Sequence, residues 1–435
     1  MTDETAEAVS ESPKETSKLN PNIAKVFNTE LKVNSVKEPN DYEVLTKVAL
    51  EALKFFPPLY FNSIFGSVKS WLPPHRDLSE YTVLSPWRPL RAIDYLIDTS
   101  VPAFAHAPGP WASTLLPPLM RELFWRPSNY FQQADPFDCV TSYSDEHWFF
   151  LNGIATNQAV AEMNSALISE LFLRPVTVIH NQTDSVALDL LQCAIGKSFK
   201  TDPSLDESQT MTEPAIKATV AILEALKDPA RSKVVLLCHS QGTIIAANVL
   251  RALQRCLSNI KRLTKEPDAK PKLLLDVIDE LALNILYTDY LKQCDCAAVD
   301  QNLTELLRKL EVYTFANCAD KMNYITQVHD ASGKLIGLPY IENFANEFDL
   351  VARLGVLSPL KGQEDYVEID GPIYEKKGLL AWGHLLNQHY LFGIDGYLEG
   401  ETRNPYVLTD NEEQSLSELP RLYEYAAGKR PAEYY

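Results

Sequence analysis

Residues 233–250 read KVVLLCHSQGTIIAANVL, and this stretch organises the interpretation of the whole chain. Its first part, residues 234–238, is a continuous apolar run, which is typical of a short strand buried on both faces. A tight turn follows, and a helical run begins at Thr243. Because strands buried on both faces belong to parallel sheets, the stretch predicts a strand–turn–helix unit of an α/β protein.

Ser240 lies at the tip of this turn, in the tetrapeptide His239-Ser240-Gln241-Gly242. A serine between a strand and a helix is the layout of a nucleophile elbow, in which a strained turn holds the hydroxyl clear of the sheet. Gly242 supplies a small residue where strand and helix pack closely, whereas Cys238 replaces the first glycine of the pattern G-x-S-x-G. The alternative is an ordinary loop in which Ser240 caps the helix.

Strand and helix patterns alternate on both sides of the turn. Apolar runs that favour strands lie at 148–151, 176–181, 310–317, 338–346 and 366–370, the last of which is expected to be the final strand. Helical patterns lie at 158–171, 186–199, 214–227 and 272–310. This spacing predicts βαβ units, and therefore an α/β fold with a mostly parallel sheet flanked by helices.

The composition divides the chain into four segments. Residues 1–40 are polar and poor in aromatic residues, so they are expected to be disordered. Residues 41–145 are rich in proline and aromatic residues, and are expected to form short helices that pack on the core or cap it. Residues 146–400 hold the α/β domain, with a helical insertion around 261–310, and residues 401–435 form an acidic tail.

The composition also argues against several functions. A net charge of −18 disfavours general nucleic-acid binding, which needs clustered Lys and Arg residues. The seven cysteines are odd in number and several lie in apolar runs, which indicates reduced thiols. No metal site is expected, because Cys294 and Cys296 lack a second pair of ligands at zinc-site spacing. No signal peptide or transmembrane run is evident, which favours an intracellular, cytoplasmic protein.

Residues 44–71 combine apolar, aromatic and lysine residues at helical spacing. A segment of this kind can lie at a membrane surface or meet an apolar substrate. Two helices packed over the core produce the same pattern, and this second interpretation is favoured. Peripheral membrane contact through 44–71 is therefore a subordinate hypothesis.

A serine nucleophile needs a histidine to accept its proton, and the histidine needs a carboxylate to orient it. Asp349 follows the strand expected at 338–346, and His384 follows the final expected strand. The order along the chain is therefore nucleophile, acid, base. This order favours a triad of Ser240, Asp349 and His384.

Both partners have competitors. Asp320 follows the preceding strand and is the alternative acid, but an apolar run after Asp349 would anchor its loop better. His389 is the alternative base, although on one helix it would point to a different face from His384. Gly383 permits an irregular turn before His384, which favours His384 as the base.

An oxyanion formed when a serine attacks a carbonyl carbon needs a second N–H donor besides the amide that follows the serine. The amide of Gln241, at the start of the helix after Ser240, is one candidate. The turn after the strand at 148–151 is expected to supply the second, from the amide of Gly153 or Ile154. Gly153 favours this turn because it allows close approach of the backbone.

These motifs resemble the α/β-hydrolase superfamily, and most closely the class 3 lipases and their relatives. The resemblance rests on LLCHSQGT around Ser240, YTFAN at 313–317, the Asp-Leu-Val segment from Asp349 and the Gly-His pair ending at His384, and it covers roughly 146–400. It implies a serine esterase or lipase-like hydrolase that cleaves carboxylic esters through an acyl-enzyme, without a metal or organic cofactor. Ser240, Asp349 and His384 match the nucleophile, acid and base of that family.

For such an enzyme, the expected partner is a small apolar ester substrate. The alternative function is a catalytically inactive protein of the same fold that binds a lipid or a protein partner. Cys238 motivates this alternative, because a residue bulkier than glycine at the elbow could displace Ser240.

Overall fold

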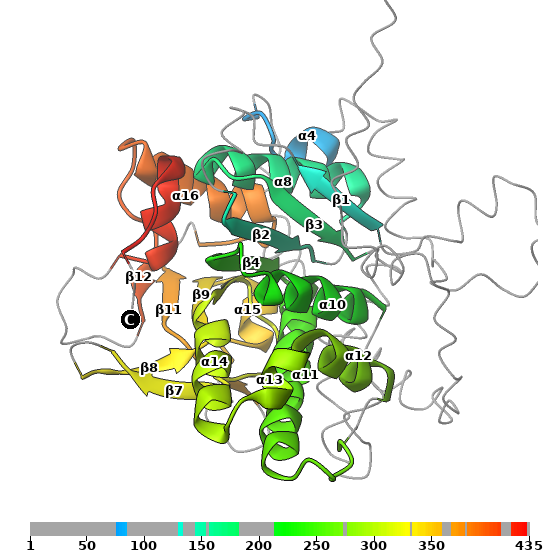
Figure 1. The fold of residues 1–435 in the computed structure, drawn as a ribbon. Helices are drawn as coiled ribbons and strands as arrows, with labels where there is room; N and C mark the ends of the chain where they lie inside the picture. The colour runs from blue at the N-terminus through cyan, green and yellow to red at the C-terminus, as the bar shows by residue number, and fades with distance from the viewer. Residues whose placement is uncertain are drawn as a thin grey trace, which may run out of the picture.

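The computed structural model describes residues 75–84, 129–133, 144–153, 156–181, 213–272, 276–330, 333–358, 367–378, 381–409 and 419–432. The expectations for 1–40, for 44–71 and for a helix at 186–199 fall outside the described residues. At the centre of the fold is an eight-stranded sheet with the strand order β1-β3-β2-β4-β5-β9-β11-β12 (Figure 1).

The inner strands of this sheet run parallel to one another. In chain order they are β2 (Glu146–Leu151), β3 (Val176–His180), β4 (Lys233–His239), β5 (Leu310–Phe315), β9 (Tyr340–Asn346) and β11 (Ile373–Lys376). The edge strands β1 (Asn129–Gln133) and β12 (Val407–Leu408) pair antiparallel with their neighbours. The sheet confirms the predicted α/β class with mostly parallel strands.

The central strands are apolar because helices cover both faces of the sheet. Every residue of β4, β5 and β9 is buried. A strand without an exposed face has no reason to alternate polar and apolar residues. The continuous apolar run at 234–238 is the consequence, and the strand predicted there is confirmed.

The helices form two layers (Figure 1). One layer contains α10 (Glu213–Lys227), α11 (Gln241–Lys265), α12 (Asp276–Leu286) and α14 (Cys296–Arg308). The other contains α8 (Gln158–Phe172), the π-helix η5 (Leu386–Leu391) and α16 (Phe392–Leu398). Three shorter helices are α4 (Tyr81–Leu84), α13 (Asp289–Gln293) and α15 (Leu350–Leu354). The sheet is thus the middle of a three-layer arrangement.

The stretch expected to be helical at 272–310 is divided into α12, α13 and α14. Asp295 starts the last of these, because its side chain accepts a hydrogen bond of 2.7 Å from the backbone N–H of Ala298. An aspartate in this position is a typical N-cap. Helix α12 packs against α10 and α11, and α14 packs against α11, so both belong to the layer that covers the sheet.

The prediction of the final strand at 366–370 is wrong. Among the described residues, Glu368–Ile369 (β10) pairs with Lys321–Met322 (β6) in a separate two-stranded sheet and not with the main sheet. Gly371 has φ +93° and lies so close to Ile341 that a Cβ would come within 2.4 Å of its carbonyl oxygen. This turn directs the chain into the sheet only after Pro372, where β11 begins. A hairpin of β7 (Thr326–His329) and β8 (Leu335–Leu338) lies apart from the main sheet.

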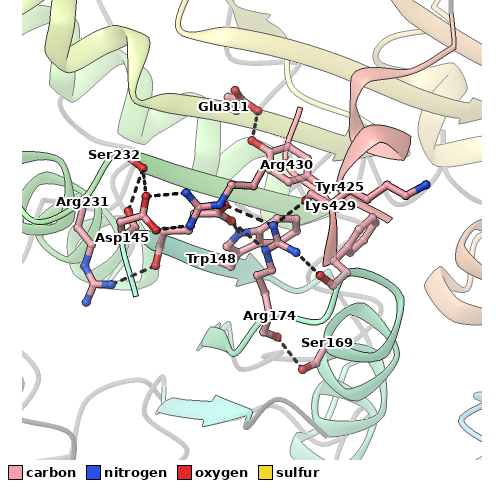
Figure 2. A network of polar contacts seen from close by, with 12 residues as sticks. Asp145, Trp148, Ser169, Arg174, Arg231, Ser232, Glu311, Tyr425, Lys429 and Arg430 are labelled. Carbon is pink, nitrogen blue, oxygen red and sulfur yellow. Dashed lines mark hydrogen bonds and ion pairs between the residues drawn. The ribbon is translucent and has the colours of Figure 1, made fainter. Parts of the chain in front are cut away.

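The C-terminal segment packs against the core at the starting ends of the strands, opposite the end where Ser240 follows β4. Its 3₁₀-helix η6 (Arg421–Gly428) buries Leu422 and Tyr425. Figure 2 shows the polar network around it, in which the Tyr425 hydroxyl donates to Glu311 at 2.8 Å and Arg174 donates to the carbonyl of Lys429 at 2.8 Å. This segment therefore belongs to the α/β core, although no role for it was evident from the sequence.

Candidate active site

Ser240 occupies a strained turn between β4 and α11. Its backbone has φ 55° and ψ −125°, a region that residues other than glycine rarely adopt. The Ser240 N–H donates to the carbonyl of Phe315 at 3.0 Å, and its carbonyl accepts the hydroxyl of Thr243 at 2.7 Å. The Ser240 hydroxyl does not cap the helix. The turn therefore has the geometry expected of a nucleophile elbow, and the alternative of a simple capping serine does not hold.

Two glycines allow the elbow to pack against the end of β2. A Cβ on Gly242 would come within 2.4 Å of the carbonyl oxygen of Leu151. A Cβ on Gly153 would come within 2.6 Å of the Ser240 Cβ. Since Cβ atoms do not approach other heavy atoms this closely, both positions require glycine.

Cys238 fits into the sheet without altering this turn. Its thiol is buried and points toward β5, where Sγ lies 3.6 Å from the carbonyl oxygen of Tyr313. Burial raises the pKa of the Cys238 thiol, so the group stays neutral. The larger residue is thus accommodated beside the neighbouring strand, and Ser240 keeps its positive φ.

His384 and Asp349 form a buried pair. Nδ1 of His384 lies 2.8 Å from Oδ2 of Asp349. The same oxygen accepts the hydroxyl of Tyr390 at 2.6 Å, and Oδ1 accepts the N–H of Val351 at 2.8 Å. The carboxylate is therefore held by three donors. Since Nδ1 donates to it, the neutral imidazole has Nε2 free to accept a proton.

Side chains from two strands, β9 and β4, also hold the backbone around His384. Asn346 donates to the carbonyl of Gly383 at 3.1 Å. Nε2 of His239 lies 2.8 Å from the carbonyl oxygen of His384, and the two rings are 4.6 Å apart. Burial lowers the pKa of His239 well below its usual value, so the ring is neutral and donates through Nε2. His239 therefore makes a structural contact with the loop of His384.

Nδ1 of His239 has no hydrogen-bond partner among the described residues, and the same is true of two atoms of the candidate triad, Oγ of Ser240 and Nε2 of His384. Both residues are buried, with 1% and 5% of their surface exposed. Buried polar atoms are seldom left unpaired, and such atoms point to a function. His239 connects the two residues, because it precedes Ser240 in the chain and contacts His384. No direct hydrogen bond joins them in this state.

The alternative candidates lie in different surroundings. Nδ1 of His389 accepts the N–H of Leu385 at 2.9 Å, and its Nε2 lies 3.0 Å from the hydroxyl of Tyr81. Burial lowers the pKa of His389 to about 3. Both ring nitrogens are thus engaged, which makes His389 a poor base. Asp320 precedes β6, where its carbonyl accepts the N–H of Glu368 at 2.7 Å, whereas Asp349 contacts His384.

Of the oxyanion candidates, Gln241 is the first residue of α11 and Gly153 lies against Ser240. Ile154 lies outside the described residues. Asn152 fixes the turn that carries Gly153, because it exchanges hydrogen bonds of 2.7 and 2.8 Å with the backbone of Asn181. Asn181 in turn donates to the side chain of Gln241 at 2.6 Å. The two expected donors thus belong to one connected set of loops.

The interpretation of the sequence missed the asparagines that organise these loops. Asn152 and Asn181 directly follow β2 and β3, Asn317 lies two residues after β5, and Asn346 ends β9. Each of them hydrogen-bonds a neighbouring loop or strand through its side chain. The repeated Phe-Ala-Asn at the ends of two strands was a visible signal of this arrangement.

No group of three or more His, Cys, Asp or Glu side chains that could hold a metal ion occurs in the part of the chain that the structure describes. Among the same residues, no helix is both long enough and apolar enough to cross a membrane. No protein-family model matches the chain, and no curated protein or solved structure matches it significantly. A functional interpretation therefore rests on the geometry of the site itself.

Proposed function

We propose that the protein is a serine hydrolase of the α/β-hydrolase type that cleaves carboxylic esters with apolar acyl groups. Ser240 is the nucleophile, His384 the base and Asp349 the acid. The observation that carries the proposal is the positive φ of Ser240 at the β4–α11 turn, in a site that also contains the buried His384–Asp349 pair. The three residues come in the chain order of that fold.

In the first half of the reaction, Oγ of Ser240 attacks the ester carbonyl carbon while its proton passes to Nε2 of His384. Asp349 accepts the hydrogen bond from Nδ1 and stabilises the imidazolium that forms. The negative charge on the former carbonyl oxygen is met by the amide of Gln241 and by the turn at Gly153. His384 then returns the proton to the departing alcohol, and the acyl group stays on Ser240.

In the second half, a water molecule attacks the acyl-enzyme. His384 accepts a proton from the water, and the carbonyl–Oγ bond breaks. The proton moves from His384 to Oγ, so that Ser240 is regenerated and a carboxylic acid leaves. The reaction consumes one ester and one water and yields an acid and an alcohol.

The burial of Ser240 and His384 supports an apolar acyl group. A polar substrate would lose its hydration on entering such a site without gaining equivalent hydrogen bonds, whereas an acyl chain gains from leaving water. This argument favours fatty-acyl or similar esters over small hydrophilic ones.

A second candidate function is a catalytically inactive protein of the same fold that binds a lipid or protein partner. The observation that favours it is that no hydrogen bond joins Oγ of Ser240 to Nε2 of His384. Catalytic hydrogen bonds are often long before substrate binds, so this observation is compatible with an active enzyme as well.

Hydrolysis of p-nitrophenyl esters, from acetate to palmitate, separates the two candidates. The wild-type protein is expected to hydrolyse the longer esters, and Ser240→Ala to reduce kcat by roughly 10³-fold or more. Ser232→Ala is the matched control, because Ser232 is exposed just before β4, the strand that leads to Ser240. Equal activity of Ser240→Ala and the wild-type protein would contradict the proposal.

A further inference from the structure

Residues 75–84, from the N-terminal region, lie against the segment that carries His384. The carboxylate of Glu80 is buried and accepts two backbone N–H groups, from Asn387 at 2.7 Å and from Gln388 at 2.9 Å. These amides belong to the first turn of η5, the helix that begins two residues after His384.

The start of η5 needs such an acceptor. The N-terminal N–H groups of a helix have no partner within the helix, and a side chain usually caps them. Here the N-cap residue is Leu385, which makes no side-chain cap hydrogen bond. Glu80, 307 positions earlier in the chain than Asn387, supplies the acceptor that Leu385 lacks. Its negative charge also interacts favourably with the positive end of a helix.

Three further contacts join the same two segments. The Tyr81 hydroxyl lies 3.0 Å from Nε2 of His389. Ser79 donates to the side chain of Gln388 at 2.6 Å, and Asn387 donates to the carbonyl of Leu78 at 2.8 Å. Residues 78–81 therefore hold η5 through four consecutive positions. Arg76 adds an ion pair with Asp395 in α16.

These contacts extend to the residue next to His384. Tyr81 contacts Nε2 of His389, and Nδ1 of the same ring accepts the N–H of Leu385 at 2.9 Å. Glu80 fixes the amides of Asn387 and Gln388. The backbone that follows His384 is thus attached to residues 80 and 81, in addition to the contacts from Asn346 and His239 described above.

We propose that Glu80 is a positioning residue for His384, and that residues 75–84 form a strap without which His384 does not keep Nδ1 directed at Asp349. The proposal rests on the proposed function, because it assigns the strap a role in catalysis. It implies that the α/β core alone, without this part of the N-terminal region, is a poor enzyme.

Glu80→Gln in the full-length protein tests the proposal, because the change keeps the size of the side chain and removes its charge. Glu399→Gln is the matched control, since Glu399 is exposed just after α16. Burial raises the pKa of Glu80 to about 7, so the measurements belong at about pH 8, where the carboxylate is ionised. Tyr81→Phe is a milder second variant, because it removes a single hydroxyl. It keeps the proposal testable if Glu80→Gln fails to fold.

Two measurements are made on each variant: hydrogen exchange of peptides that cover 383–391, and the kinetics of p-nitrophenyl ester hydrolysis. Glu80→Gln is expected to raise exchange in 383–391 selectively and to lower kcat roughly tenfold or more, with little change in KM. Tyr81→Phe is expected to do the same to a smaller extent. Glu399→Gln should change neither quantity.

Unchanged exchange in 383–391 and unchanged kcat in both variants would overturn the proposal. Faster exchange throughout the chain, with kcat lowered only in proportion to unfolding, would also overturn it, because Glu80 would then be merely structural. If the wild-type protein hydrolyses no ester, the proposed function fails. The exchange measurement still decides whether Glu80 and Tyr81 hold the turn of His384.

Discussion

Oδ2 of Asp349 accepts two hydrogen bonds at once, from Nδ1 of His384 at 2.8 Å and from the Tyr390 hydroxyl at 2.6 Å. The other carboxylate oxygen accepts the N–H of Val351 at 2.8 Å. This arrangement fixes both the carboxylate and the tautomer of the histidine, and two predictions follow from it.

Asp349→Asn should lower kcat for ester hydrolysis by about 10⁴-fold, as the same change does in the catalytic triad of a serine protease. If the side-chain NH₂ of the asparagine takes the place of Oδ2, it donates to Nδ1 of His384. This contact favours the tautomer that carries its proton on Nε2. That tautomer cannot accept the proton of Ser240. Steady-state kinetics with p-nitrophenyl esters measure the effect, and Asp289→Asn, an exposed position, serves as control. A loss of less than tenfold would show that Asp349 does not act on the base.

Tyr390→Phe should lower kcat roughly tenfold, because it removes one charge-assisted hydrogen bond from Asp349 and keeps the aromatic ring. Burial and the nearby Asp349 raise the pKa of Tyr390 well above its usual value, so the hydroxyl stays protonated and donates. Kinetics and thermal unfolding are measured together. Tyr290→Phe, on the surface, is the control. A lowered melting temperature with unchanged kcat would assign Tyr390 to stability alone.

Gly153→Ala should disable the site by displacing Ser240. The new Cβ would lie 2.6 Å from the Ser240 Cβ, so one of the two backbones has to move. A shift of this size is expected to cost roughly 10²-fold in kcat and about 1–3 kcal/mol in the free energy of unfolding. Gly393→Ala is the matched control, because its Cβ would meet only the side chain of Pro405, at 3.3 Å. Full activity of Gly153→Ala would contradict the close contact between Gly153 and Ser240.

Glu342→Gln should change how stability depends on pH. Burial, together with the nearby carboxylate of Glu311, raises the pKa of Glu342 from 4.5 to about 7, although hydrogen bonds from Tyr340 and from the amides of Arg421 and Leu422 act in the opposite direction. Between these two pH values the native state binds more protons than the unfolded state. The free energy of unfolding therefore falls as pH rises from 4.5 to 7, by up to about 3 kcal/mol from this residue.

Urea unfolding across this pH range tests the sign and the size of the effect. The control is Glu424→Gln, an exposed change in the C-terminal segment whose backbone contacts Glu342. The wild-type protein and this control should show the same dependence of the free energy of unfolding on pH. Glu342→Gln should flatten it. An identical slope in Glu342→Gln would mean that another group binds the proton.

The sequence predicted those parts of the fold that depend on local pattern. The run at 234–238 forms a strand because it is buried on both faces, and the helices expected at 158–171 and 214–227 match α8 and α10 to within one residue at each end. Asp349 and His384 were selected from chain order, because parallel strands deliver their following loops to one edge of the sheet. The structure places the two side chains together there.

The missed features depend on partners that are distant in the chain. Strands β11 and β12 are only four and two residues long, so no periodic pattern distinguishes them from loops. Glu342 is buried because the backbone of Arg421, 79 positions later, donates to it. Glu80 is buried against η5 in the same way. Carboxylates of this kind resemble surface residues in a sequence, since only the fold supplies their donors.

Labelling with a fluorophosphonate tests directly whether Ser240 is an activated nucleophile. The folded wild-type protein is treated with the probe, and the modified residue is located by mass spectrometry of its peptides. If Ser240 is the nucleophile, a single adduct on Ser240 is expected, and heat denaturation or His384→Ala should abolish it. Absence of an adduct on Ser240 in the folded protein would contradict it.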